Sequence, residues 1–270
     1  MTVPTNRREA APPLAWYLTD AARAVSEYGM FLAAGPWLPA LPRGDGQPVL
    51  VLPGLMTADS STRPLRLVLK HLGYRVHGWG LGRNIGPTAR AVHGMRDRLD
   101  DLAQRYRRPV SIVGWSLGGI FARELARRTP DSVRQVITLG SPIRLASESQ
   151  SRAHRFFERY SHLHIEHWQL PLEHGYEPLT MPATSIYSKF DGIVAWRACL
   201  DDPSPRSENI AVLGSHLGLG HHPAVVWAVT DRLAEPEGAW RPFRAPALLR
   251  HAFPRPDVPA PSRPATGATA

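Results

Sequence analysis

The sequence of 270 residues contains very little cysteine and lysine. Cys199 is its only cysteine, which excludes an intrachain disulfide and a four-cysteine zinc site. Only Lys70 and Lys189 are lysine, and the other basic residues are arginine. No run of about 20 apolar residues is present, as a membrane-spanning helix would require. The N-terminal segment carries Asp20 and Glu27 where a signal peptide needs an uncharged apolar core, so we expect a cytoplasmic protein.

The formal net charge is +9, and arginine, alanine and proline are all abundant. This composition is typical of a GC-rich genome. The positive charge also favours attraction to phosphates, anionic lipid headgroups or acyl carrier proteins. The densest arginine groups lie at 105–108 and 152–159, and no nucleic-acid-binding motif accompanies them. We therefore expect no nucleic-acid partner.

The chain alternates between short apolar runs and stretches with helical spacing. The apolar runs predict strands at 49–52, 74–79, 110–113, 133–139, 183–188 and 209–213. Helices are predicted at 13–34, 62–72, 88–106, 119–128 and 223–233. This order predicts an α/β fold, with a mostly parallel sheet and helices on both faces. In such a sheet the functional site lies at the carboxyl ends of the strands.

The alternation defines a central domain at residues 46–234, with three segments that differ from it. A polar and aromatic stretch without a strand predicts a short cap, inserted at about residues 143–181. Residues 1–45 form an N-terminal tail and an apolar helical segment. Residues 235–270 form a tail rich in proline and alanine. Disorder is predicted at 1–12 and 254–270.

Residues 13–42 are the most apolar part of the chain outside the predicted core. The helical spacing places one broad apolar face on Leu14, Leu18, Ala21, Ala22, Val25, Tyr28, Gly29 and Leu32. The simplest interpretation is a helix packed on the domain's own surface. The alternatives are an interfacial patch near the substrate entrance, in peripheral contact with a membrane, or a surface for a partner. The oligomeric state is not indicated by any pattern.

Residues 114–118 read Gly-Trp-Ser-Leu-Gly, a G-x-S-x-G pattern around Ser116. A β-branched apolar run precedes the pattern and a helical stretch follows it, which is the context of a nucleophile elbow. A serine hydroxyl is a poor nucleophile and needs a general base, which in turn needs an orienting carboxylate. The pattern therefore predicts Ser116 as a nucleophile.

Asp191 and His216 are the candidate acid and base, because each directly follows a predicted strand. The order serine, aspartate, histidine differs from the orders in chymotrypsin-like and subtilisin-like proteases. The competing candidates are Asp201 and Asp202 for the acid, and His221 and His222 for the base.

The negative oxygen of a tetrahedral intermediate needs hydrogen-bond donors, and two backbone amides are candidates. The amide of Leu117 begins the helix after the elbow, and the amide of Leu55 follows the first strand. Their neighbours Met56 and Trp115 are candidate substrate-binding residues. The histidine-rich stretch 162–167 has no cysteine nearby and is interpreted as a solvated face, so we expect no metal and no other cofactor.

These motifs resemble those of the α/β-hydrolase superfamily, over about residues 46–234. The resemblance rests on Pro53-Gly-Leu55, Gly114-Trp-Ser-Leu-Gly-Gly119, Asp191-Gly-Ile-Val194 and Gly214-Ser-His216. Within the superfamily the chain is similar to small bacterial esterase- and lipase-like hydrolases, and to PGAP1-like lipid deacylases. Its Gly-Trp-Ser-Leu-Gly-Gly string is similar to that of carboxylesterases acting on pimeloyl carrier-protein methyl esters. The family often has His-Gly before the oxyanion residue, where this chain has Pro53.

The resemblance implies a serine hydrolase that cleaves carboxylic esters through an acyl-enzyme. The apolar segment 13–42 and the aromatic cap favour esters with apolar acyl chains, or lipids, as substrates. Two alternatives remain open. An acyltransferase would use the same three residues, and a non-catalytic interaction protein would use the same fold for binding alone.

Overall fold

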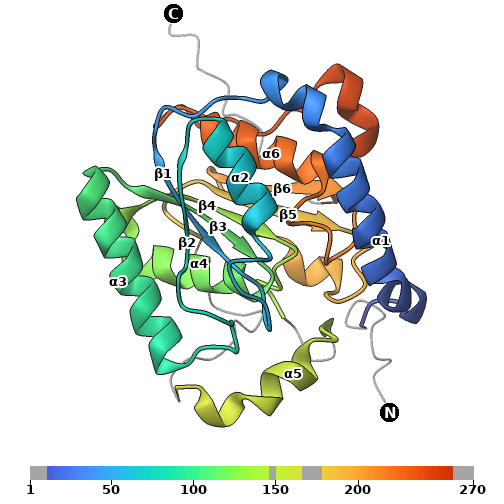
Figure 1. The fold of residues 1–270 in the computed structure, drawn as a ribbon, viewed down its shortest axis with the longest axis horizontal. Helices are drawn as coiled ribbons and strands as arrows, with labels where there is room; N and C mark the ends of the chain where they lie inside the picture. Colours follow the sequence, from blue (N-terminus) through green and yellow to red (C-terminus); the bar gives the residue numbers. More distant parts are fainter. Residues whose placement is uncertain (1–10, 146–149, 166–177, 258–270) are drawn as a thin grey trace, which may run out of the picture.

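The centre of the molecule is a six-stranded parallel sheet in the order β2-β1-β3-β4-β5-β6 (Figure 1). A computed structural model describes residues 11–145, 150–165 and 178–257. The strands are β1 (Pro48–Leu52), β2 (Arg75–Gly78), β3 (Val110–Trp115), β4 (Val133–Leu139), β5 (Ala183–Ser188) and β6 (Ser207–Val212). The α-helices are α1 (Leu14–Ala33), α2 (Arg63–His71), α3 (Ala89–Tyr106), α4 (Leu117–Arg128), α5 (His154–Arg159) and α6 (Pro223–Ala234). The 3₁₀ helices are η2 (Gly35–Ala40), η3 (Pro130–Ser132), η5 (Ser161–Leu163), η6 (Trp196–Cys199) and η7 (Ala247–Ala252).

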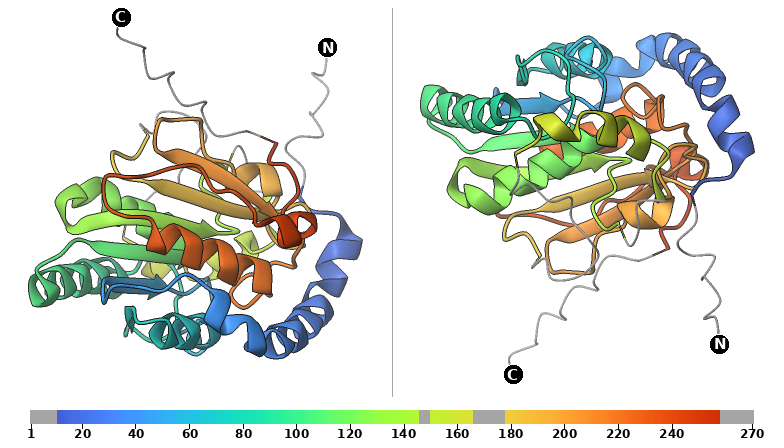
Figure 2. Two further views of the ribbon diagram at one scale, coloured as in Figure 1. Left: turned by 90° about the horizontal axis from the view of Figure 1, so that it is seen from above. Right: turned by 90° about the horizontal axis from the view of Figure 1, so that it is seen from below.

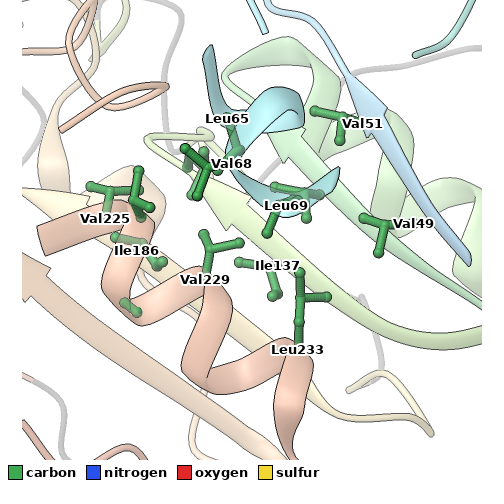
Figure 3. Close-up of a cluster of buried hydrophobic side chains, with 14 of the residues drawn as sticks. Val49, Val51, Leu65, Val68, Leu69, Ile137, Ile186, Val225, Val229 and Leu233 are labelled. Carbon is green, nitrogen blue, oxygen red and sulfur yellow. The ribbon is translucent and has the colours of Figure 1, made fainter. Parts of the chain in front are cut away.

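Side chains of the central strands alternate between two cores, one on each face of the sheet. On β1, Val49 and Val51 belong to the core covered by α2 and α6, which Figure 3 shows. Leu50 and Leu52 belong to the core covered by α3 and α4. Successive side chains of a strand point to opposite faces, so a strand buried on both sides must be apolar throughout. The predicted sheet with helices on both faces is confirmed (Figure 2).

Helix α1 lies against the loops that follow β5 and β6 (Figures 1 and 2). Most of its apolar side chains are exposed to solvent. Leu18 is 70% exposed and Val25 is 74% exposed. The buried face instead carries Asp20, Ala24 and Glu27. The helix therefore packs on the domain through its polar face, and its broad apolar face is exposed. The two carboxylates face inward because backbone amides of both loops donate hydrogen bonds to them.

The segment from Glu235 to Asp257 packs on the domain, although its composition predicted a tail. The amide of Phe243 donates to the buried carboxylate of Glu208 at 2.6 Å. The hydroxyl of Tyr187 donates to Asp257 at 2.9 Å. The predicted disorder from residue 254 is thus wrong as far as Asp257, because polar anchors on β5 and β6 hold this segment. Residues 1–10 and 258–270, also predicted to be disordered, lie outside the described residues.

None of the helices in the described ranges combines the length and the hydropathy that a transmembrane span requires.

We expect the substitution Leu69→Ala to lower the free energy of unfolding by about 2–5 kcal/mol, because it leaves a cavity in the core under α2. Denaturant unfolding followed by circular dichroism measures this loss. The matched control is Leu67→Ala on the same helix, where the side chain is 53% exposed. An equal loss in both variants would contradict the packing of α2 described here.

Candidate active site

Ser116 occupies a sharp turn between the end of β3 and the start of α4. Its φ of 53° and ψ of −122° lie in a region that residues with a Cβ rarely adopt. A Cβ at Gly114 would overlap the carbonyl of Gly118, and a Cβ at Gly118 would overlap the carbonyl of Leu52. The amide of Ser116 donates to the carbonyl of Leu139 on β4 at 2.8 Å. These contacts hold the strand, the turn and the helix in one arrangement, as an elbow requires.

Asp191 and His216 are in direct contact at the carboxyl ends of β5 and β6. Nδ1 of His216 lies 2.6 Å from Oδ2 of Asp191, and both side chains are buried. Oδ1 of Asp191 accepts hydrogen bonds from the amides of Ile193 and Val194, at 2.8 and 2.7 Å. The carboxylate is therefore held by its own loop on one oxygen and holds the imidazole with the other.

Burial by itself lowers the pKa of His216, because it disfavours the charged imidazolium. The charge of Asp191 and its hydrogen bond act in the other direction, and Asp20 adds to them. The net result is a pKa of His216 above its ordinary value of 6.5. A base with a raised pKa accepts a proton more readily.

Ser116 and His216 line the same pocket, which has a volume of about 240 Å³. In the part of the chain that the structure describes, the hydroxyl of Ser116 makes no direct hydrogen bond to His216. Such bonds are often long in structures without substrate and tighten when substrate binds. Ala153 and Phe156, from the segment predicted as a cap, line the pocket as well, so this segment lies beside Ser116.

The competing acids have other partners. Both oxygens of Asp201 accept from Arg123, at 2.6 and 3.0 Å. Asp202 pairs with Arg144 at the surface. Neither aspartate contacts His216, so among the candidate acids Asp191 alone has the geometry of an orienting carboxylate.

The competing bases are likewise engaged. Nε2 of His221 lies 3.0 Å from the carbonyl oxygen of Ala24 in α1. His222 is the N-cap of α6, and its ring nitrogen accepts from the amide of Ala224 at 3.2 Å. Burial lowers the pKa of His222 to about 4, so this histidine is neutral at ordinary pH.

Gly140, directly after β4, has no side chain and so leaves room for the side chains of Asp191 and His216. Its φ is 55°, and a Cβ there would lie 3.2 Å from both Oδ2 of Asp191 and Nδ1 of His216. A glycine that ends a strand has many ordinary explanations, so the sequence carried no signal for this one.

Leu55 and Leu117, whose amides are the predicted oxyanion donors, both line a pocket beside Ser116. Leu117 is the first residue of α4, so its N–H has no partner within the helix. The turn after β1 is tight, with Met56 at a φ of 63°, and a Cβ at Gly54 would lie 3.2 Å from Cβ of Ser116. Among the described residues, the amide of Leu55 donates to no backbone carbonyl.

Asn84 holds the turn that carries Leu55, and sequence reasoning missed it. The side-chain NH₂ of Asn84 donates to the carbonyl of Pro53 at 2.8 Å. The backbone carbonyl of Asn84 accepts from the amide of Met56 at 2.6 Å. Its own amide donates to the carbonyl of Thr57 at 2.8 Å. Asn84 lies in the glycine-rich loop 80–86 and is fully buried, which is rare for an asparagine without such a role.

The two candidate substrate-binding residues, Met56 and Trp115, both line the pocket of Ser116. The indole N–H of Trp115 also donates to the carbonyl of His216 at 3.2 Å. Trp115 therefore lines the pocket and also contacts the backbone of His216.

The described residues hold no group of three or more histidine, cysteine, aspartate or glutamate side chains that could bind a metal ion. His164, in the histidine-rich stretch, lies with its Nε2 2.8 Å from the carbonyl of Ile85. Glu166 and His167 lie outside the described residues. The absence of a metal and of another cofactor stays a prediction.

Comparison with known proteins supports one fold. No family model matches the chain. In structure it is similar to lipase B of Aspergillus fumigatus, with a TM-score of 0.54 and 17% identity, over 76% of this chain and 58% of the lipase. The chain has the α/β-hydrolase fold. The fold that the sequence resemblance implies is confirmed, and the resemblance to PGAP1-like lipid deacylases stays a prediction.

In sequence, part of the chain is similar to proteins named pimeloyl-[acyl-carrier protein] methyl ester esterase. The protein of Shewanella woodyi is 32% identical over 109 residues, which cover 40% of this chain and 41% of the relative. A protein of the same name from Neisseria meningitidis is 32% identical over 98 residues, which cover 28% of this chain and 38% of the relative. The match thus spans about two fifths of the length of these relatives.

We expect Asn84→Ala to lower activity on a soluble ester while KM changes little, because the turn that presents the amide of Leu55 loses its support. Loss of one oxyanion donor costs about 2.7–4 kcal/mol of transition-state stabilisation, so kcat should fall by up to about 10²–10³-fold. Steady-state kinetics measure the effect, and circular dichroism checks the fold. Unchanged kcat in a folded variant would contradict this role of Asn84.

Proposed function

We propose that this chain is a serine hydrolase that cleaves carboxylic esters with apolar acyl groups. The observation that carries the proposal is the shared pocket of Ser116 and His216, with Nδ1 of His216 2.6 Å from Asp191. A strained, buried serine beside a base of raised pKa is the arrangement that nucleophilic catalysis needs. The names of the curated relatives, which describe methyl ester esterases, support the same class of reaction.

In the first half of the proposed reaction, Oγ of Ser116 attacks the ester carbonyl and its proton passes to Nε2 of His216. Asp191 accepts the hydrogen bond from Nδ1 and stabilises the imidazolium. The amides of Leu55 and Leu117 donate to the oxygen of the tetrahedral intermediate. The intermediate collapses to an acyl-enzyme, and the alcohol leaves with the proton from His216.

In the second half, a water molecule attacks the acyl-enzyme while His216 takes the water's proton. A second tetrahedral intermediate forms and uses the same two amides. Its collapse returns the proton to Oγ of Ser116 and releases the carboxylic acid.

The surroundings of Ser116 support an apolar substrate. A second pocket, of about 50 Å³, lies on the α4 side of the serine, with Ile120, Leu145 and Phe157 in its wall. The larger pocket of about 240 Å³ has Tyr17 and Phe156 in its wall. Apolar walls on both sides of the nucleophile suit an ester whose two halves carry hydrocarbon groups.

A fluorophosphonate probe tests the nucleophile, because it forms a covalent bond only with an activated serine. We expect labelling of the wild type and no labelling of Ser116→Ala, measured by intact-mass spectrometry.

On p-nitrophenyl esters from acetate to palmitate, His216→Ala should lose nearly all activity. His71→Ala, which removes an exposed histidine on α2, should keep it.

A folded wild type that neither takes the probe nor cleaves any of these esters would contradict the proposal and favour a non-catalytic role. Formation of a new ester when an alcohol is added would indicate acyl transfer instead of hydrolysis.

We further propose that the outer face of α1 and η2 contacts an anionic lipid surface, which would present apolar esters to the pocket. Leu18, Val25 and Trp37 are all more than half exposed there. The net charge of +9 provides the attraction to anionic headgroups that such contact needs. Tyr17 of the same helix lines the pocket, so the outer face and the substrate site adjoin. The cytoplasmic location stays a prediction.

Co-sedimentation with vesicles tests this contact. We expect the protein to bind vesicles that contain phosphatidylglycerol, to bind pure phosphatidylcholine less, and to be released by high salt. The variant Val25→Glu should bind much less than Leu67→Glu, which places the same charge at an exposed apolar position of α2. Equal binding by the two variants would rule out this face of α1.

A further inference from the structure

The inner face of α1 meets the two loops that carry the proposed acid and base. Asp191 lies in the loop after β5 and His216 in the loop after β6, and α1 passes against both (Figure 1). This contact joins residues that are more than 170 positions apart in the chain. None of the motifs around Ser116 predicts it.

Asp20 is the centre of this contact and is 1% exposed. Its Oδ2 accepts from the amide of Gly192 and from the amide of His216, each at 3.0 Å. Its Oδ1 accepts from the amide of Leu217 at 2.9 Å. One carboxylate therefore binds the residue after the acid, the base itself, and the residue after the base.

Glu27 lies two helical turns further on and makes a similar contact on the same face. It accepts from the amide of Ser215 at 2.8 Å and from the hydroxyl of Ser215 at 2.7 Å. Burial raises the pKa of Glu27, and the hydrogen bonds from Ser215 oppose that rise.

The two loops carry glycine where α1 comes closest. A Cβ at Gly192 would overlap the carbonyl of Trp16, and a Cβ at Gly218 would overlap the carboxylate of Glu27. Helix and loops are thus built for close backbone contact, which fixes their separation.

We propose that Asp20 is a positioning residue of the active site, which fixes the loop of Asp191 and the loop of His216 relative to each other. This inference rests on the proposed function. A carboxylate bonded to three amides of two loops has little freedom to move, so the distance between Nδ1 of His216 and Asp191 depends on it. A displacement of about 1 Å in such a site can cost about a hundredfold in rate.

Asp20 also adds negative charge beside the base. Two carboxylates contact His216 directly, Asp191 at its Nδ1 and Asp20 at its backbone amide. The other charged or titratable groups nearby are Arg23, which pairs with Asp20, Glu27, which binds Ser215, Arg152, which lines the same pocket, and His221 and His222, which follow in the chain. Asp191 and Asp20 both favour the imidazolium and raise the pKa of His216. Loss of the Asp20 charge should therefore lower this pKa.

The test compares the wild type with Asp20→Asn and Asp20→Ala in the full chain. Asn keeps one acceptor oxygen but turns an NH₂ group towards backbone amides, so kcat should fall about tenfold to a hundredfold with little change in KM. Asp20→Ala should lose more. In the pH profile of kcat/KM, the rise on the acid side, which reports deprotonation of His216, should move to lower pH in Asp20→Asn. Fluorophosphonate titration corrects each rate for the fraction of active sites.

The matched control is Glu208→Gln, which alters another buried carboxylate that binds a backbone amide, at the opposite end of β6. It should lower the melting temperature, while corrected kcat and the acid side of the profile stay as in the wild type. If Asp20→Asn behaves like this control, Asp20 is only structural and the inference is overturned. If the wild type itself takes no probe and cleaves no ester, the proposed function fails first.

Discussion

The backbone of Ser116 must be held at a φ of 53°, and the site depends on the contacts that hold it there. Such a conformation costs about 1–3 kcal/mol and persists only where the surroundings impose it. Here β3 and β4 fix the turn from one side through the bond between Ser116 and Leu139. Close packing at Gly114 and Gly118 fixes α4 against the sheet from the other. The same turn places Ser116 in the wall of the pocket and leaves the amide of Leu117, at the start of α4, without a partner within the helix.

The three buried carboxylates around this turn have the same kind of partner, because each accepts hydrogen bonds from backbone amides. Asp191 accepts from its own loop, Asp20 from the loops of the acid and the base, and Glu27 from Ser215. A buried carboxylate without partners costs several kcal/mol, and a buried amide without an acceptor is costly as well. Pairing the two satisfies both needs at once. The same hydrogen bonds attach the loops to α1. One set of contacts therefore both buries the candidate residues and fixes their positions.

Helix α1 reverses the usual arrangement of an amphipathic helix on a globular protein. Its carboxylates face the domain, and most of its large apolar side chains, Leu18 and Val25 among them, face outward, while Phe31 packs against the core. Because hydrophobic periodicity shows only which residues share a face, it predicted the helix and its apolar stripe but not which side of the helix packs on the domain. A helix bound through hydrogen bonds to loops leaves its apolar surface free for another contact. The two faces of one helix thus link the geometry of the proposed site to the surface around its pocket.

The sequence by itself determined the sheet, its helices, the elbow at Ser116 and the three candidate residues in their order. Each of these produces a recognisable pattern among residues that are close together in the chain. Alternation of apolar side chains and the strand–turn–helix around Ser116 need no knowledge of distant contacts. Only the tertiary structure decided that Asp191, and not Asp201, contacts His216, and that Asn84, Gly140 and Asp20 meet the segments around the candidate residues. These choices depend on hydrogen bonds and close approaches between segments far apart in the chain. An asparagine, a glycine or an aspartate carries no local sign of the partner it will meet once the strands are assembled.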